Sequence, residues 1–142
     1  MIFCFLAECL GPYNTLSQPW RGALIPNGCR NPNCDNNLPQ GWYRFQGPAG
    51  THLPIAPVSG SACGVCHVSS AAWIESRQHP VLGHPPININ ICFSWGGNPC
   101  IYRRNGRAVA CRDPAGLDFF LYFLPPSPGC SYGYCGLHGF HG

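Results

Sequence analysis

Eleven cysteines in 142 residues constrain this chain more than any other feature. Cysteine at this density is typical of a disulfide scaffold in an oxidising compartment, because cytosolic thiols are kept reduced. A chain of this length can also bury roughly two-thirds of its unfolded surface, so a hydrophobic core should accompany the disulfides. The sequence therefore predicts a secreted, extracellular protein stabilised by both covalent bonds and a core.

Glycine and proline break the chain into short segments, with 18 and 16 residues respectively. Long helices do not fit between these breaks, whereas short runs of aromatic and β-branched residues favour strands. We predict a small, disulfide-rich, mainly β fold of short strands and hairpins with one or two short helical turns. The predicted strands span residues 2–6, 41–46, 89–95, 101–104, 107–111 and 117–124.

Two local structures are predicted inside this pattern. Asn105-Gly106 separates two runs that could pair, and Asn-Gly favours the type I′ turn of a hairpin, here over residues 100–111. Residues 62–75 are the best candidate for a short helix, with Ser69 or Ser70 as its N-cap.

Charge gives little indication of a polyanionic partner. Only 9% of the residues are charged, and the net charge is +3. Four of the arginines, Arg103, Arg104, Arg107 and Arg112, are close in sequence, and we interpret them as solvated charges around the predicted hairpin turn. No apolar run approaches the roughly 20 residues that span a bilayer. We expect neither nucleic-acid binding nor a membrane span.

Cys63-Gly-Val-Cys66-His67 has the form of a c-type haem attachment site. The other nine cysteines would have no role in a monohaem cytochrome. With His79 and His84, the two cysteines also match the spacing of a zinc finger. Prolines interrupt the segment that would have to carry these histidines on a helix. A haem or metal site here is therefore the weakest of our hypotheses, and we expect no cofactor.

Catalytic signatures are absent from the sequence. There is no G-x-S-x-G nucleophile elbow, and the five acidic residues show no spacing that suggests a catalytic pair. We expect that the protein is not an enzyme. Ordinary N-x-[ST] glycosylation acceptors are also missing, so any glycan should be O-linked, for example at Ser127.

Cysteines and aromatic residues recur together in six stretches: ECLGPYNTLSQPWR, CDNNLPQGWYRFQGPAGT, CHVSSAAWI, HPVLGH, ICFSWGGNPCIY and LYFLPPSPGCSYGYC. In this order they resemble the eight-cysteine extracellular domain of uromodulin and of the pancreatic zymogen-granule glycoprotein. The resemblance covers the chain from about Cys9 to Cys135. It implies a structural setting for the four tryptophans, Trp20, Trp42, Trp73 and Trp95.

The resemblance also implies a disulfide pattern: Cys9 with Cys111, Cys34 with Cys130, Cys66 with Cys135, and Cys92 with Cys100. Three cysteines fall outside these eight. We expect Cys29 and Cys63 to form an extra pair, which leaves Cys4 as an odd thiol. An odd cysteine in a secreted protein suggests an intermolecular bond.

Three parts of the chain are expected from these observations. Residues 1–8 form an N-terminal strand or arm, residues 9–135 the eight-cysteine domain, and residues 136–142 a Gly/His-rich tail. The apolar start has no basic n-region and is too short for a whole signal peptide. We therefore expect it to belong to the mature protein, or the chain to be a fragment of a longer one.

Our first functional hypothesis is a structural or adhesive subunit of an extracellular matrix or filament. The apolar residues 1–6 would pair with a neighbouring subunit, so the partners would be copies of the chain or other extracellular proteins. The alternative is a module that binds a carbohydrate or protein ligand through exposed Trp or Tyr faces. Chemistry at the Cys63–His67 motif ranks third.

Overall fold

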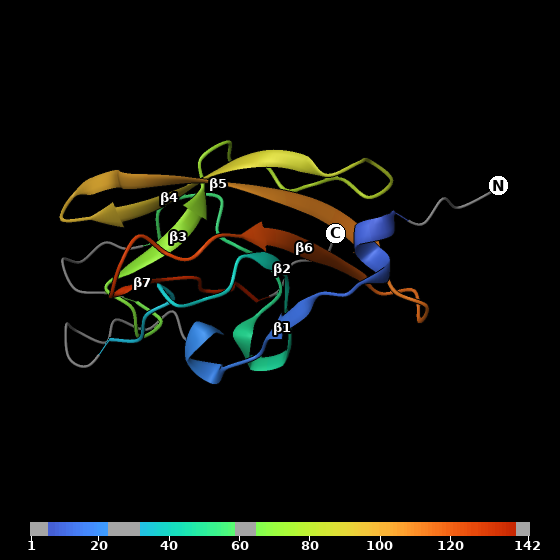
Figure 1. The fold of residues 1–142 in the computed structure, drawn as a ribbon, viewed down its shortest axis with the longest axis horizontal. Helices are drawn as coiled ribbons and strands as arrows, with labels where there is room; N and C mark the ends of the chain where they lie inside the picture. Colours follow the sequence, from blue (N-terminus) through green and yellow to red (C-terminus); the bar gives the residue numbers. More distant parts are fainter. Residues whose placement is uncertain (1–5, 23–31, 59–64, 139–142) are drawn as a thin grey trace.

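The computed structural model describes residues 6–22, 32–58 and 65–138, which form a seven-stranded sheet (Figure 1). The outer pairs β1–β2 and β3–β7 are parallel, and the inner strands are antiparallel. In sheet order the strands are β1 (Asn14–Leu16), β2 (Gly41–Phe45), β6 (Asp118–Leu124), β5 (Asn98–Arg112), β4 (Ile87–Trp95), β3 (Ser70–Ile74) and β7 (Tyr132–Gly133).

Helical structure in the described residues is limited to three short 3-10 turns: η1 (Ala7–Leu10), η2 (Pro19–Gly22) and η3 (Gly47–Ala49). The predicted mainly β, disulfide-rich fold class is confirmed, with one more helical turn than expected. None of the described helices has the length and apolar character needed to cross a membrane.

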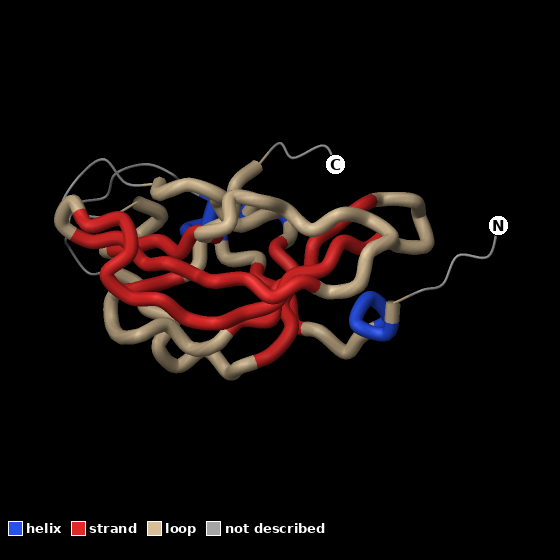
Figure 2. Tube along the Cα trace, turned by 90° about the horizontal axis from the view of Figure 1, so that it is seen from above, coloured by secondary structure: helices blue, strands red, loops and turns tan. Residues whose placement is uncertain are grey.

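The main core lies on one face of the sheet, where alternate side chains of the central strands point inward. Ile91 of β4, Ala108 of β5 and Tyr122 of β6 are fully buried there. The Tyr122 hydroxyl accepts a hydrogen bond of 3.1 Å from the backbone N–H of Leu53, and burial raises the pKa of this phenol. A smaller cluster around Val109 lies on the opposite face, beside η1. Figure 2 shows η1 as the blue helix near the N-terminus, at one end of the sheet.

The predicted hairpin at residues 100–111 is wrong. Strand β5 runs through Asn105 and Gly106 without a turn, and the four clustered arginines lie along it. The turn is formed by Gly96 and Gly97, whose φ angles of 54° and 84° fit the type I′ geometry between Trp95 and Asn98. Asn105-Gly106 therefore lies in an extended strand and not in a turn. Gly106 is required there because β5 passes close to Ile91 of β4 and to the backbone of Phe123 in β6. A Cβ at Gly106 would lie 2.7 Å from both Ile91 Cδ1 and the Phe123 carbonyl oxygen.

The predicted helix at residues 62–75 is also wrong in its described part. Ser70–Ile74 is strand β3, and all five residues are buried between β4 and β7. A helix cannot pass through Cys66 and His67, because their φ angles of 46° and 58° place them in the left-handed region. The predicted strands 41–46, 89–95 and 117–124 correspond to β2, β4 and β6. Most of segment 2–6 lies outside the described residues.

Four disulfides cross-link the described residues: Cys9–Cys111, Cys34–Cys130, Cys66–Cys135 and Cys92–Cys100. These pairs are the ones that the resemblance implies. The first three join residues 102, 96 and 69 positions apart. In the chain-entropy model, closing loops of this size contributes about 4–5 kcal/mol each. Cys4, Cys29 and Cys63 lie outside the described residues, so their pairing stays a prediction, as do the domain bounds.

Candidate functional site

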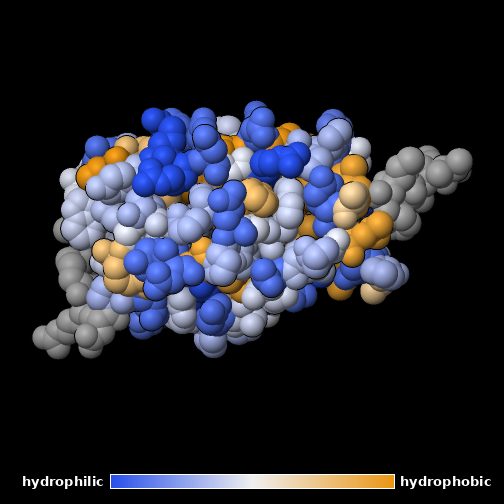
Figure 3. All heavy atoms as spheres, in the orientation of Figure 1, coloured by the Kyte–Doolittle hydropathy of each residue, from blue (hydrophilic) through white to orange (hydrophobic). Residues whose placement is uncertain are grey.

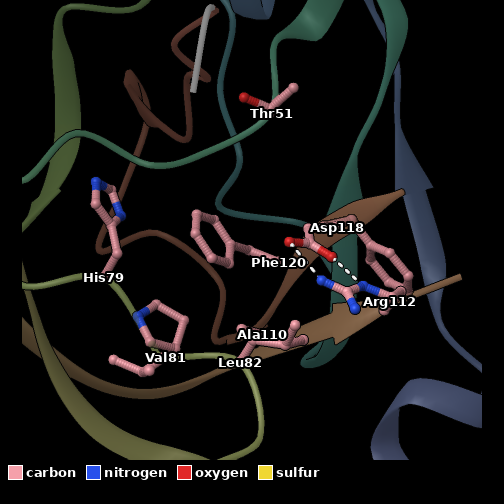
Figure 4. A pocket seen from close by; sticks show the side chains of 10 residues that line it. Thr51, His79, Val81, Leu82, Ala110, Arg112, Asp118 and Phe120 are labelled. Carbon is pink, nitrogen blue, oxygen red and sulfur yellow. Dashed lines mark hydrogen bonds and ion pairs between the residues drawn. The ribbon is translucent and has the colours of Figure 1, made fainter. Parts of the chain in front are cut away.

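A groove lies between the loop at residues 79–83 and strands β5 and β6 (Figure 4). Its volume is about 500 Å³, and its walls include Val81, Leu82, Ala110 and Phe120. It continues into a second compartment of about 490 Å³, which shares Leu82, Ala110 and Arg112 and is lined also by Leu6, Cys9 and Cys111. The Cys9–Cys111 disulfide therefore forms part of the wall and holds η1 beside the groove.

The rings of His79 and Phe120, which both line the groove, stack on each other, and His52 packs edge-on against His79. The His79 ring lies parallel to Phe120, at 7° and 5.3 Å between centroids, and His52 meets His79 edge-on at 5.1 Å. Burial lowers the pKa of His79. The pKa of His52 falls to about 4, first because of burial and then because of repulsion by His79 and His138. Both imidazoles are therefore neutral at pH 7, and the part of the groove wall formed by His79 and Phe120 is uncharged.

An ion pair provides the charge at the mouth of the groove. Arg112 and Asp118 face each other across β5 and β6, and Arg112 Nε donates to Asp118 Oδ1 at 2.7 Å (Figure 4). Exposed apolar side chains lie around the same end of the molecule, where Figure 3 shows orange atoms at the right. The exposed apolar residues contributed by η1, the groove loop and the β5–β6 turn are Leu10, Val81, Leu82 and Leu117.

This arrangement suits binding better than proton transfer. Thr51 Oγ1 lies 2.9 Å from His52 Nδ1, but an imidazole with a pKa of about 4 is a weak base at neutral pH. The part of the chain that the structure describes holds no group of three or more histidine, cysteine or acidic residues that could bind a metal ion.

The structure separates the residues of the predicted haem or metal motif. Cys66 is fully buried and joined to Cys135, so its sulfur can supply neither a haem thioether nor a zinc thiolate. His79 lines the groove, while His84 is exposed. Cys63 lies outside the described residues. The hypothesis of haem or metal binding is wrong in its use of Cys66. Ser127, the expected glycan acceptor, is 6% exposed, and its hydroxyl donates to the Gly129 carbonyl oxygen.

Sequence reasoning missed the groove altogether. In the sequence, the spacing of His79 suggests only a zinc ligand, and its stacking partner Phe120 lies on a distant strand. The segment HPVLGHPP carried a usable signal, since Val81 and Leu82 are apolar residues in a proline-bounded loop, where a solvated turn would have polar ones.

A seven-stranded sheet cross-linked by four disulfides, with an apolar groove and without a long helix in the described residues, is typical of a disulfide-rich extracellular module. The chain belongs to the uromodulin-like eight-cysteine domain family, whose family model matches residues 43–136.

Relatives in three mammals support this assignment. The chain is 37% identical over 102 residues to the pancreatic secretory granule membrane major glycoprotein GP2 of Mus musculus, covering 72% of this chain and 18% of that protein. It is 32% and 30% identical over 123 residues to the proteins of the same name from Rattus norvegicus and Canis lupus familiaris, covering 87% of this chain and 22% of each relative. The chain thus spans about a fifth of the length of these relatives.

Proposed function

We propose that this chain is an extracellular structural or adhesive module that assembles with copies of itself, and that it is not an enzyme. In this proposal the apolar residues 1–5 of one copy dock into the groove of another. The observation that carries the proposal is the position of Leu6. It lines the groove and directly follows the sequence Met-Ile-Phe-Cys-Phe.

The groove and the segment are matched in chemistry, because both are largely apolar. Apolar side chains dominate the shared wall, and four of the five segment residues are large and apolar. Five extended residues reach about 17 Å, which is enough to bridge to a neighbouring copy in contact. Burying exposed leucine and valine side chains at this end would supply the driving force, because each fully buried side chain contributes about 1.5–3 kcal/mol.

The odd number of cysteines suggests that a disulfide also joins the two copies at this contact. Eleven thiols cannot all pair within one chain, so at least one is left over in a monomer. Cys4 lies two residues before Leu6, so a segment that crosses to another copy would carry this thiol to the contact. We expect a disulfide between chains at Cys4.

Sedimentation of the full chain tests the proposal. We expect residues 1–142 to form dimers or larger species, and a chain shortened to residues 6–142 to be monomeric with its four described disulfides intact. Leu82→Glu in the groove should have the same effect. The matched control is Ile101→Glu, at a residue that is 41% exposed but does not line the groove, and it should assemble normally. Assembly of the shortened chain would show the proposal to be wrong.

A ligand-binding module is the second candidate function. It is favoured by a separate surface, on which Trp95 and Tyr102 are exposed at the β4–β5 hairpin. This candidate does not depend on self-assembly through the groove.

A further inference from the structure

An aromatic cluster lies near the turn of the β4–β5 hairpin and includes β7. Tyr132 of β7 is its centre, with ring centroids 6.4 Å from Trp95, 5.5 Å from Tyr102 and 5.8 Å from Phe93. All three contacts are edge-to-face, with interplanar angles of 69–77°. Trp95 and Tyr102 are 40% and 43% exposed, whereas Phe93 is fully buried. The cluster therefore extends from the core to the surface.

The exposed rings of Trp95 and Tyr102 pack against Tyr132, which in turn packs on the buried ring of Phe93. Phe93 and Tyr102 are register partners across β4 and β5, and the Cys92–Cys100 disulfide closes the hairpin beside them. Phe93 also packs edge-to-face on Tyr134, which is fully buried. Rings fixed in this way lose little conformational entropy when a ligand covers them, which favours binding.

Polar groups lie next to the exposed rings. The guanidinium of Arg104 lies 5.7 Å from the centroid of the Tyr102 ring, within the range of a cation–π contact. Burial raises the pKa of the Tyr132 phenol, and the nearby Tyr102 adds to this effect. The cluster therefore combines aromatic rings with two phenol hydroxyls and one guanidinium.

Arg104 differs from the other arginines of β5. Arg103 and Arg112 donate to the carboxylates of Glu75 and Asp118 at 2.7 Å. Arg107 lies over the Trp42 ring, on the other face of the strand. Nη1 of Arg104 donates a hydrogen bond of 3.0 Å to the carbonyl oxygen of Arg103. Within the described ranges, no carboxylate forms an ion pair with Arg104. Its charge is available for a ligand anion.

From this geometry we propose that Trp95, Tyr102 and Arg104 bind an acidic pyranose, a sugar ring that carries a carboxylate. The C–H face of the ring would lie on the aromatic faces, which are electron-rich. The carboxylate would accept hydrogen bonds from the guanidinium, and the sugar hydroxyls would bond to the phenols. The proposal rests on the ligand-binding candidate function, and not on assembly through the groove.

Titration of the full chain with 3′-sialyllactose and with lactose tests the proposal, because the two probes differ by the acidic sugar. Saturation-transfer NMR or calorimetry should show binding of 3′-sialyllactose at least tenfold tighter than binding of lactose. Arg104→Gln should reduce the affinity for 3′-sialyllactose to that for lactose. Trp95→Ala should remove binding of both sugars.

Three controls test whether any loss of sugar binding is specific to the proposed site. Arg107→Gln removes a ring-stacked arginine from the opposite face of β5 and should leave both affinities unchanged. Leu82→Glu, which disables the groove, should also leave them unchanged, so failure of assembly and failure of sugar binding are distinguishable. Non-reducing peptide mapping should show that each variant keeps the four described disulfides.

The results that would overturn the proposal are equally specific. Equal affinity for the two sugars, or an equal loss of affinity in Arg104→Gln and Arg107→Gln, would exclude a specific acidic-sugar site. The rings could instead bind a proline-rich peptide. If the parent chain binds a deca-proline peptide but no sugar, and Trp95→Ala loses the peptide, the proposal is wrong and the ligand of this site is a proline-rich peptide.

Discussion

Arg21 and Asp35 form a bidentate ion pair in the interior of the molecule, with both nitrogen-to-oxygen distances at 2.8 Å. The two residues are 2% and 3% exposed. The backbone of Tyr134 joins them, because its N–H donates to Asp35 Oδ2 and its carbonyl accepts from Arg21 Nη1, each at 2.8 Å. The pair therefore links η2, the loop before β2 and the segment after β7.

Removing one partner of this pair should be strongly destabilising. Asp35→Ala would leave the Arg21 guanidinium buried without its counter-charge, which costs about 3–5 kcal/mol. The double variant Arg21→Met with Asp35→Ala should lose clearly less than the sum of the single variants. Urea denaturation with the disulfides intact measures these free energies of unfolding. A loss below about 1 kcal/mol for Asp35→Ala would contradict the expectation.

Disulfides that close long loops should contribute more than the one that closes a hairpin. Replacing Cys9 and Cys111 with alanine opens a separation of 102 residues, whereas replacing Cys92 and Cys100 opens one of 8. In the chain-entropy model the first variant should lose about 2 kcal/mol more stability than the second. Thermal unfolding followed by circular dichroism compares the two, and equal losses would show that chain entropy does not determine their contributions.

Acidification should destabilise the fold through His52. Its pKa is about 4 in the folded chain, against an ordinary value of 6.5. Between these two values the unfolded chain binds a proton at this position that the folded chain does not. The free energy of unfolding therefore falls as the pH falls through this window, and this contribution is complete near pH 4.

The variant His52→Gln should show a shallower decline in stability between about pH 7 and pH 4 than the parent chain. Denaturation curves at several pH values in this range provide the measurement. The parent chain, measured under the same conditions, provides the reference slope. An unchanged slope in His52→Gln would assign the effect to other groups.

A methyl group at Gly106 should destabilise the sheet by about 1–3 kcal/mol through overpacking against Ile91 and Phe123. Gly41 is the control, because a Cβ there meets nothing within 4 Å. Chemical denaturation of Gly106→Ala and Gly41→Ala should separate the two positions. Similar stability of both variants would mean that β4 and β6 can move apart at little cost.

The sequence predicted strands best where aromatic and β-branched residues alternate near turns, as in β2, β4 and β6. It failed at Asn105-Gly106 and at Gly96-Gly97, because both dipeptides carry a turn signal and only the packing around Gly106 decides between them. It failed again at Ser70–Ile74, where pairing with two neighbouring strands overrides a weak helical tendency.

The candidate site was harder to predict because its parts are far apart in the chain. His79 meets Phe120 only after β6 has folded against the loop at residues 79–83. The buried ion pair of Arg21 and Asp35 is only weakly indicated by the sequence. Charged residues are scarce in this chain, and these two directly follow Trp20 and Cys34, which are typical of buried positions. The four described disulfide pairs came from the resemblance, and spacing alone leaves many connectivities open.

The Cys9–Cys111 bond also has a mechanical consequence. A pulling force applied to the N-terminal segment passes through this bond directly into β5, which lies at the centre of the sheet. Strand β1 and the loop before β2 are bypassed and carry no tension. If residue 135 is the other point of attachment, only the stretch from Cys111 to Cys135 can lengthen, even in a fully unravelled chain. This stretch reaches at most about 80 Å when extended, whereas an uncross-linked chain of 142 residues would reach about 480 Å. The disulfides would therefore limit how far the module can extend under tension.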